Sequence, residues 1–198
     1  MADVAWALVL IVLATAGRVA CLEWPNLSPV AGLAIGAGWL IRRGSLAMTV
    51  PLVSMLISDR LAGGYELPVM LTVYTALTLP VLLGRLGRSF VRSRQIRNAS
   101  VHVATAGAIG AASGLISSLL FYLSTNAAFW AFASHEGTTL AQAYVDGLPF
   151  LRYTLTGDLV TAPLACAAAA AIGLLTIDAR VASPIADGIS NGNGRRVD

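Results

Sequence analysis

Long apolar runs with almost no charge inside them constrain this chain more than any other feature of its sequence. Hydrophobic residues make up 57% of its 198 residues, and only 12% are charged. Soluble domains carry roughly twice that share of charge, because polar side chains must cover their core. The mean hydropathy of +0.74 over the whole length therefore excludes a soluble fold and predicts an integral membrane protein.

Six apolar runs follow one another along the chain, and polar segments separate them. They cover residues 4–19, 29–41, 45–58, 67–83, 101–132 and 153–177. Because about 20 apolar residues are needed to cross a bilayer as a helix, the second and third runs are short. They fit either two short or tilted crossings, or one re-entrant hairpin that turns at residues 42–43. With two crossings, the sequence predicts an all-α membrane protein built as a bundle of six transmembrane helices.

The positions of the arginines favour two crossings over a hairpin. The 13 basic residues are all Arg. With six crossings, ten of them fall on one side, in the loops after the second and fourth runs and in the C-terminal tail. Only Arg18, Arg60 and Arg152 fall on the other side. Since cytoplasmic loops are enriched in Lys and Arg, we expect both termini to lie in the cytoplasm.

Residues 179–198 differ in composition from the rest of the chain, because they are rich in Gly, Asn and Ser and hold few large apolar groups. Such a segment buries too little apolar surface to fold. We expect a disordered cytoplasmic tail there, after a membrane domain over residues 1–178. The first apolar run is expected to be a span rather than a cleaved secretion signal, because Asp3 and no basic residue precedes it.

Acids, amides and aromatic residues gather on the predicted outer side, in or beside the spans. Ionisable groups at membrane depth are costly, so they are usually paired and often functional. Aromatic walls with a few fixed polar groups are typical of small-molecule sites. We therefore expect an outward-facing binding site whose substrate contacts come from Arg18, Trp24, Asn26, Asp59, Asn126, Trp130, Tyr144 and Asp158.

Several of these residues also have a simpler structural interpretation. Asn26 can cap the second helix, and Trp130 can anchor its helix at the membrane interface. Asp158 lies inside an apolar span, where a lone carboxylate needs a partner. Arg18, Arg152 and a ligand are all candidates for that partner, so a structural ion pair and a ligand contact both stay open.

Motifs of known catalytic chemistry are missing from the sequence. It contains no HExxH, GxSxG or Walker A pattern, and its two histidines, His102 and His135, are isolated. We expect no catalytic residue, no metal site and no cofactor. Energy for any active transport must then come from a partner or a gradient. Nucleic acid is not expected as a partner either, because the arginines lie between apolar runs rather than on a soluble basic face.

A pattern of spaced motifs resembles a family of uncharacterised bacterial integral membrane proteins. The resemblance covers about residues 17–177. It rests on Arg18, the run Trp24-Pro25-Asn26-x-Ser28-Pro29, Pro51, Met55, Ser58-Asp59, Thr125-Asn126, Trp130, Tyr144, Pro149-Phe150 and Gly157-Asp158. That family is similar to the substrate-binding S components of energy-coupling factor (ECF) transporters.

The resemblance implies a fold, a location and a set of partners. S components are small six-helix proteins that bind a vitamin or a metal ion at the outer face, and they work with a coupling subunit and two ATPases. A non-enzymatic, multi-pass subunit of the bacterial inner membrane is therefore implied, with an unassigned small molecule or ion as substrate. Two alternatives stay open: a structural or assembly membrane protein without a small ligand, and a membrane enzyme that uses Asp59 and Asp158 as an acid–base pair.

Overall fold

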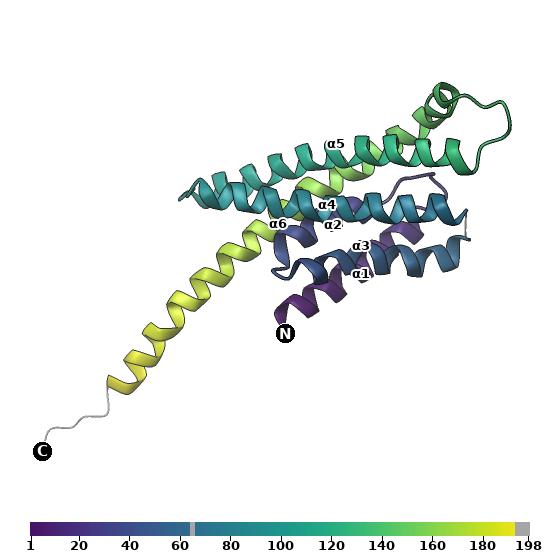
Figure 1. Ribbon diagram of the computed structural model, residues 1–198. Coiled ribbons are helices and arrows are strands. Elements are labelled where there is room, and N and C mark those ends of the chain that lie inside the picture. Colours follow the sequence, from purple (N-terminus) through teal and green to yellow (C-terminus); the bar gives the residue numbers. More distant parts are fainter. Residues whose placement is uncertain (64–65, 193–198) are drawn as a thin grey trace, which may run out of the picture.

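Apolar sequence of this kind satisfies its backbone most simply as helix, because a helix pairs its interior N–H and C=O groups within itself. The computed structural model describes the backbone of residues 1–63 and 66–192 and the side chains of residues 1–63 and 66–175. Within these residues there are six helices and no strand: α1 (Ala2–Ala20), α2 (Val30–Leu40), α3 (Gly44–Ala62), α4 (Leu67–Ser93), α5 (Ala99–Phe132) and α6 (Leu140–Gly192). They run side by side in one bundle, with α5 along one side and α1 and α3 along the other (Figure 1).

Local side-chain chemistry sets several of the helix ends. The side chain of Asn98 accepts a hydrogen bond of 3.0 Å from the backbone N–H of Val101 and so caps α5. At the start of α6, the N–H of Gln142 donates to Thr139 Oγ1, and the N–H of Thr139 donates back to Gln142 Oε1. This reciprocal pair is a capping box. Gly63, in the left-handed region at φ +93°, ends α3.

Five of the helices have the length and composition of membrane spans: α1, α3, α4, α5 and α6 over Leu140–Leu175. The fold is therefore that of a multi-pass membrane protein, as predicted. The prediction of a full-length second span is wrong. α2 has only 11 residues, or about 16 Å at 1.5 Å per residue, against a hydrocarbon core of roughly 30 Å. Two boundaries also differ, because α4 continues to Ser93 and α6 already begins at Leu140.

The chain nevertheless passes from one end of the bundle to the other between α1 and α3. Asp3 Oδ2 accepts hydrogen bonds from the backbone N–H groups of Arg42 and Arg43, so the start of α1 lies beside the end of α2. At the other end, Arg18 near the end of α1 pairs with Asp59 near the end of α3. The hairpin interpretation is therefore wrong. α2 covers part of the crossing, and the non-helical segment 21–29 covers the remainder.

The two ends of the bundle differ in composition, and we call them the arginine-rich end and the opposite end. The arginine-rich end carries the beginning of α1, the α2–α3 turn and the last turns of α4, where Arg85 and Arg88 donate to the carbonyl oxygens of Arg42 and Trp39. The opposite end carries Arg18 and Asp59.

Glycines let α2 approach its neighbours closely. Nine of its eleven residues are buried. A Cβ atom added to Gly38 would lie 2.0 Å from the carbonyl oxygen of Val81 on α4, and one added to Gly84 on α4 would lie 2.0 Å from that of Ile35. On α6, Thr161 meets Gly32 in the same way. Close backbone approach through small residues is how helices pack in membranes, and it holds α2 between α4 and α6.

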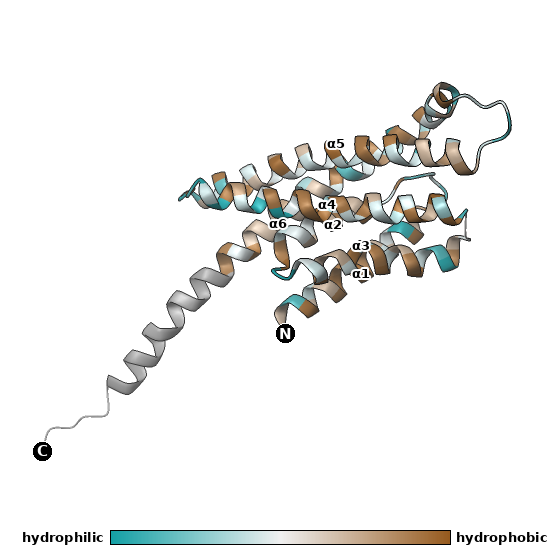
Figure 2. Ribbon diagram, in the orientation of Figure 1, coloured by the Kyte–Doolittle hydropathy of each residue, from teal (hydrophilic) through white to brown (hydrophobic). Residues whose placement is uncertain are grey.

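Many of the buried residues of the bundle are small, whereas many of the large apolar side chains point outward. Ala14, Ala34 and Ala106 are fully buried, but Leu8 and Leu164 are 59% and 65% exposed. Figure 2 shows hydrophobic residues along the length of the helices and most hydrophilic ones near the helix ends. A surface of this kind suits lipid as the surrounding solvent.

The expected disordered tail over residues 179–198 falls on residues whose side chains, and from residue 193 also whose backbone, lie outside the described part of the chain. It stays a prediction.

Candidate functional site

A cavity with both polar and aromatic walls lies at the opposite end. It has a volume of about 600 Å³ and lies between α4, α5 and α6, with Arg18 from α1 and Asn26 from segment 21–29. We call it the main cavity. Four aromatic side chains form much of its wall: Phe121, Tyr122, Phe129 and Phe150. A small cavity of about 30 Å³ adjoins it and shares Arg18, Asn26, Phe121 and Thr154 with it.

Arg18 joins the ends of three helices. Its Nη2 donates to Asp59 Oδ1, which makes the one ion pair in the described residues. The second carboxylate oxygen of Asp59 accepts a hydrogen bond of 2.9 Å from the hydroxyl of Tyr74 on α4. Asp59 is only 8% exposed, and a buried carboxylate is tolerated only when it is paired in this way. Arg18 therefore serves both as a structural cation and as part of the cavity wall.

Arg18 has donor capacity that this network does not use. Its Nε–H is buried and has no hydrogen-bond partner within the described residues. Leaving such a donor unpaired costs about 1–3 kcal/mol.

Asp158 lines the small cavity from α6 and is 1% exposed. Its Oδ2 accepts a hydrogen bond of 2.8 Å from Ser118 Oγ on α5. Neither arginine considered from the sequence is bonded to it, because Arg18 pairs with Asp59, and Arg152 donates to the hydroxyl of Tyr153. The direct partner of Asp158 is thus a hydroxyl, and Arg18 shares the small cavity with it.

The other predicted residues are divided between the cavity and its supports. Asn126 lines the main cavity, and its Nδ2 donates to the carbonyl oxygen of Tyr122. Tyr144 donates to the carbonyl oxygen of Leu123 and packs against Tyr122, with the two rings tilted and their centroids 5.6 Å apart, so it joins α5 to α6.

Two predicted tryptophans line neither cavity. Trp130 Nε1 donates to the carbonyl oxygen of Thr138 and holds the loop before α6. Trp24 is 50% exposed. Asp59 reaches the site through Arg18, since it lines neither cavity.

The predicted substrate contacts did not include a stripe of residues on α6. Asp146, Phe150 and Thr154 all line the main cavity, and they follow one another at four-residue spacing, which places them on one helix face. The stripe was hidden because the apolar run begins only at residue 153, whereas the helix begins at Leu140. The capping pair Thr139 and Gln142 was the feature of the sequence that could have shown where α6 begins.

Metal-binding side chains do not gather in the described part of the chain. No group of three or more His, Cys, Asp or Glu residues with suitable placement occurs there. His135 and Asp146 both line the main cavity but have no third ligand of this type beside them.

Comparison with known proteins shows the family of the chain. A family model described as a family of unknown function, DUF6580, matches residues 1–179. The chain belongs to the DUF6580 family. The matched range of this DUF6580 chain includes α1 to α5, most of the apolar part of α6 and all residues that line the two cavities. No curated protein and no solved structure matches it.

Proposed function

We propose that this DUF6580 protein is a membrane-embedded substrate-binding subunit that takes up a small molecule through the main cavity. The main support for this proposal is the cavity itself. Its volume of about 600 Å³ falls in the range of small-molecule sites, and it combines aromatic walls with a few fixed polar groups. Arg18 in this wall adds a guanidinium group, a strong hydrogen-bond donor for a carbonyl or carboxylate oxygen.

The lining indicates which ligands fit. The charge of Arg18 is already balanced by Asp59, and the amides of Asn26 and Asn126 add neutral hydrogen-bonding groups. Phe121 and Phe150 supply flat apolar surfaces, on which a planar ring can stack. Together with the carboxylate of Asp146 in the same lining, these groups favour a small, nearly neutral molecule with a ring and a carbonyl group, such as a vitamin or a nucleobase, over a bare metal ion.

Orientation and partners follow from the same proposal. The arginine bias supports a cytoplasmic position for the arginine-rich end, and on this proposal the main cavity faces the outside of the bacterial inner membrane. The resemblance to S components supports a coupling subunit and ATPases as the source of energy. A ligand-free assembly protein, the main alternative, has no need of a polar cavity of this size.

A ligand screen tests the proposal. Purified protein is heated with members of a panel of vitamins, nucleobases, amino acids and divalent metal salts, and unfolding is followed by tryptophan fluorescence. We expect at least one organic compound to stabilise the protein, by about 2.7 kcal/mol when present at a hundred times its Kd.

Two matched variants locate the binding site of any such compound. Thr154 lines both cavities, and Thr156 is exposed two residues further along α6. Both hydroxyls bond to the carbonyl oxygen four residues earlier. Thr154→Leu should remove the stabilisation, and Thr156→Leu should leave it. Equal effects of the two substitutions, or no stabilising compound in the panel, would count against the proposal.

Cysteine labelling tests the orientation. In a variant with Cys21 and Cys166 replaced by alanine, single cysteines are placed at the exposed positions His135 and Arg97. A membrane-impermeant maleimide added to intact cells should label the cysteine at 135 at once and the cysteine at 97 only after permeabilisation. The reverse pattern would place the main cavity in the cytoplasm and end the uptake proposal.

A further inference from the structure

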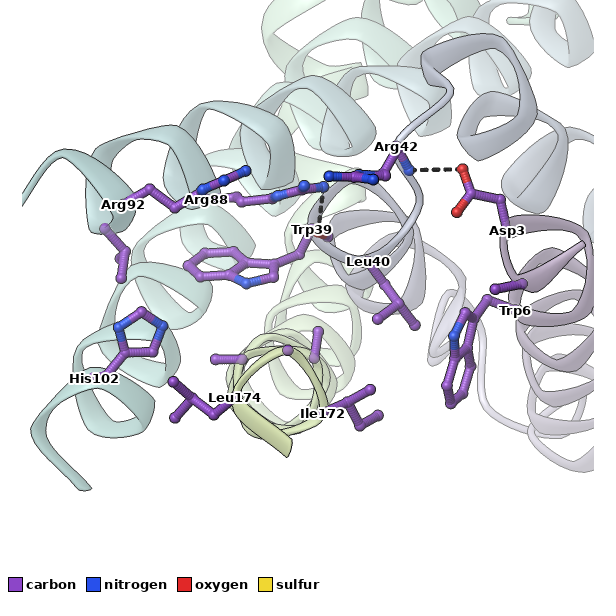
Figure 3. A pocket seen from close by; sticks show the side chains of 15 residues that line it. Asp3, Trp6, Trp39, Leu40, Arg42, Arg88, Arg92, His102, Ile172 and Leu174 are labelled. Carbon is purple, nitrogen blue, oxygen red and sulfur yellow. Dashed lines mark hydrogen bonds between the residues drawn. The ribbon is translucent and has the colours of Figure 1, made fainter. Parts of the chain in front are cut away.

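A second cavity lies at the arginine-rich end, and the proposed uptake function makes no use of it. It has a volume of about 380 Å³ and is enclosed by residues from α1, α2, α4, α5 and α6. Figure 3 shows the side chains of Arg42, Arg88 and Arg92 in a row along one side, with Ile172 and Leu174 of α6 on the other. We call it the arginine pocket.

Positive charge is concentrated there, and within the described residues no ion pair neutralises it. A neighbouring cavity of about 340 Å³ shares Arg42, Arg88 and Arg92 with the arginine pocket and adds Arg85. No carboxylate lies within ion-pair distance of these four guanidinium groups in the described residues. Asp3 also lines the pocket; its Oδ2 accepts hydrogen bonds from the backbone N–H groups of Arg42 and Arg43, and its one negative charge offsets part of the repulsion that Arg88 feels from the other arginines.

The structure holds some of these cations in place. Arg88 Nη1 donates to the carbonyl oxygen of Trp39, and Arg85 Nη1 donates to that of Arg42. Arg42, Arg85 and Arg92 all lie close enough to Arg88 for their charges to repel its own. Cations gathered at one place repel one another, and an anion bound among them relieves the repulsion.

The opposite wall of the pocket is apolar. Ile172 and Leu174 line it from α6, Leu40 from α2 and Trp6 from α1. Tryptophans are enriched at membrane interfaces, and Trp6 and Trp39 lie at the helix ends here. A soluble anion would leave this wall unused, whereas an amphiphile satisfies both walls.

We infer that the arginine pocket binds an anionic phospholipid, with the phosphate group among Arg42, Arg88 and Arg92 and the acyl chains along Ile172 and Leu174. Basic pockets between helix ends are known to suit anionic headgroups. The bound lipid fills the gap between α4 and α6 and neutralises the arginines. It belongs to the protein itself and is separate from any transported ligand.

Native mass spectrometry of the purified full-length protein tests this inference. The protein is titrated in detergent with dioleoylphosphatidylglycerol or dioleoylphosphatidylcholine, and the bound lipids are counted. We expect the anionic lipid to bind at least about tenfold more tightly, since each nearby arginine contributes roughly a fivefold gain. Equal binding of the two lipids would overturn the inference.

Two arginine variants separate the pocket from general surface charge. Arg92 is exposed, and its guanidinium donates to no residue in the described part of the chain, so Arg92→Gln should leave the fold intact. Arg97 is also exposed, lies at the same end and lines neither cavity. Arg92→Gln should weaken binding of the anionic lipid roughly fivefold, and Arg97→Gln should change it less than about twofold. Equal losses of lipid binding in the two variants would show that the lipid is attracted by surface charge in general, and would overturn the inference.

A soluble anion is distinguished by competition. Inorganic phosphate and glycerol 3-phosphate carry the charge of the headgroup without acyl chains. Neither should displace the bound lipid or raise the unfolding temperature as the lipid does. If either one does so, and Arg92→Gln abolishes that effect, the pocket is a site for a soluble phosphate and the lipid assignment is wrong.

Discussion

Gly84→Ala is expected to destabilise the protein by about 3 kcal/mol and to lower its unfolding temperature in detergent by about 10 °C. The added methyl group would lie 2.0 Å from the carbonyl oxygen of Ile35 and 2.8 Å from its carbonyl carbon. Both are backbone atoms of a buried helix, so neither can rotate away. α2 and α4 have to separate, and the contacts between them are lost. Unfolding followed by tryptophan fluorescence measures the change.

Gly107→Ala is the matched control for this prediction. Gly107 lies within α5, and a Cβ atom there would have its nearest neighbours at 3.7 and 3.8 Å, which is ordinary contact. Because alanine is the better helix former, we expect this variant to be as stable as the original or more stable by up to about 1 kcal/mol. If the two variants unfold at the same temperature, α2 does not pack against α4 as closely as described.

Arg18→Gln is expected to have the second large effect. It leaves Asp59 buried with only the hydroxyl of Tyr74 as a partner. Removing one member of a buried pair typically costs 3–5 kcal/mol. Since the side chain of Arg18 is 22% exposed, we expect a smaller loss, about 2 kcal/mol. Thermal unfolding of the purified variant measures it.

A double-mutant cycle shows whether the pair itself is responsible. Adding Asp59→Asn to the Arg18→Gln variant removes the unpaired charge and should recover about 1 kcal/mol. Arg60→Gln serves as the control, because Arg60 is exposed and makes no ion pair in the described residues; its effect should stay within about 0.5 kcal/mol. Strict additivity of the two single variants would show that Arg18 and Asp59 act independently.

The helices, and which segments lie together at each end of the bundle, could be predicted from the sequence. Apolar runs mark the helices, and the positions of the arginines along the chain mark the segments that share one end. The length of α2 could not be predicted. Its residues 30–40 are as apolar as a lipid-facing span, although nine of them are buried in protein, and hydropathy does not distinguish these surroundings. The two prolines at positions 25 and 29 were the local sign that helix is missing from the preceding segment.

The candidate site could be predicted only in outline. The concentration of polar residues at one predicted end of the bundle pointed to Arg18, Asn26 and Asn126. All three line the main cavity. Their pairing was out of reach, because Arg18 and Asp59 are 41 residues apart and only the folded bundle brings them together. Asp158 and Ser118 are likewise 40 residues apart. A serine inside an apolar run gives no sign in the sequence that it will be the partner of a buried acid.

The shortness of α2 also has a consequence for how the protein is made. α2 is synthesised before α4 and α6, the helices that shelter it. Eleven residues do not span lipid, and the non-helical backbone of residues 21–29 would expose polar groups to hydrocarbon at several kcal/mol each. This early segment therefore has to wait at the insertion machinery or in the interfacial water until α6 has been delivered. The order of synthesis and the order of assembly are different, and a segment near the N-terminus is among the last to reach its final surroundings.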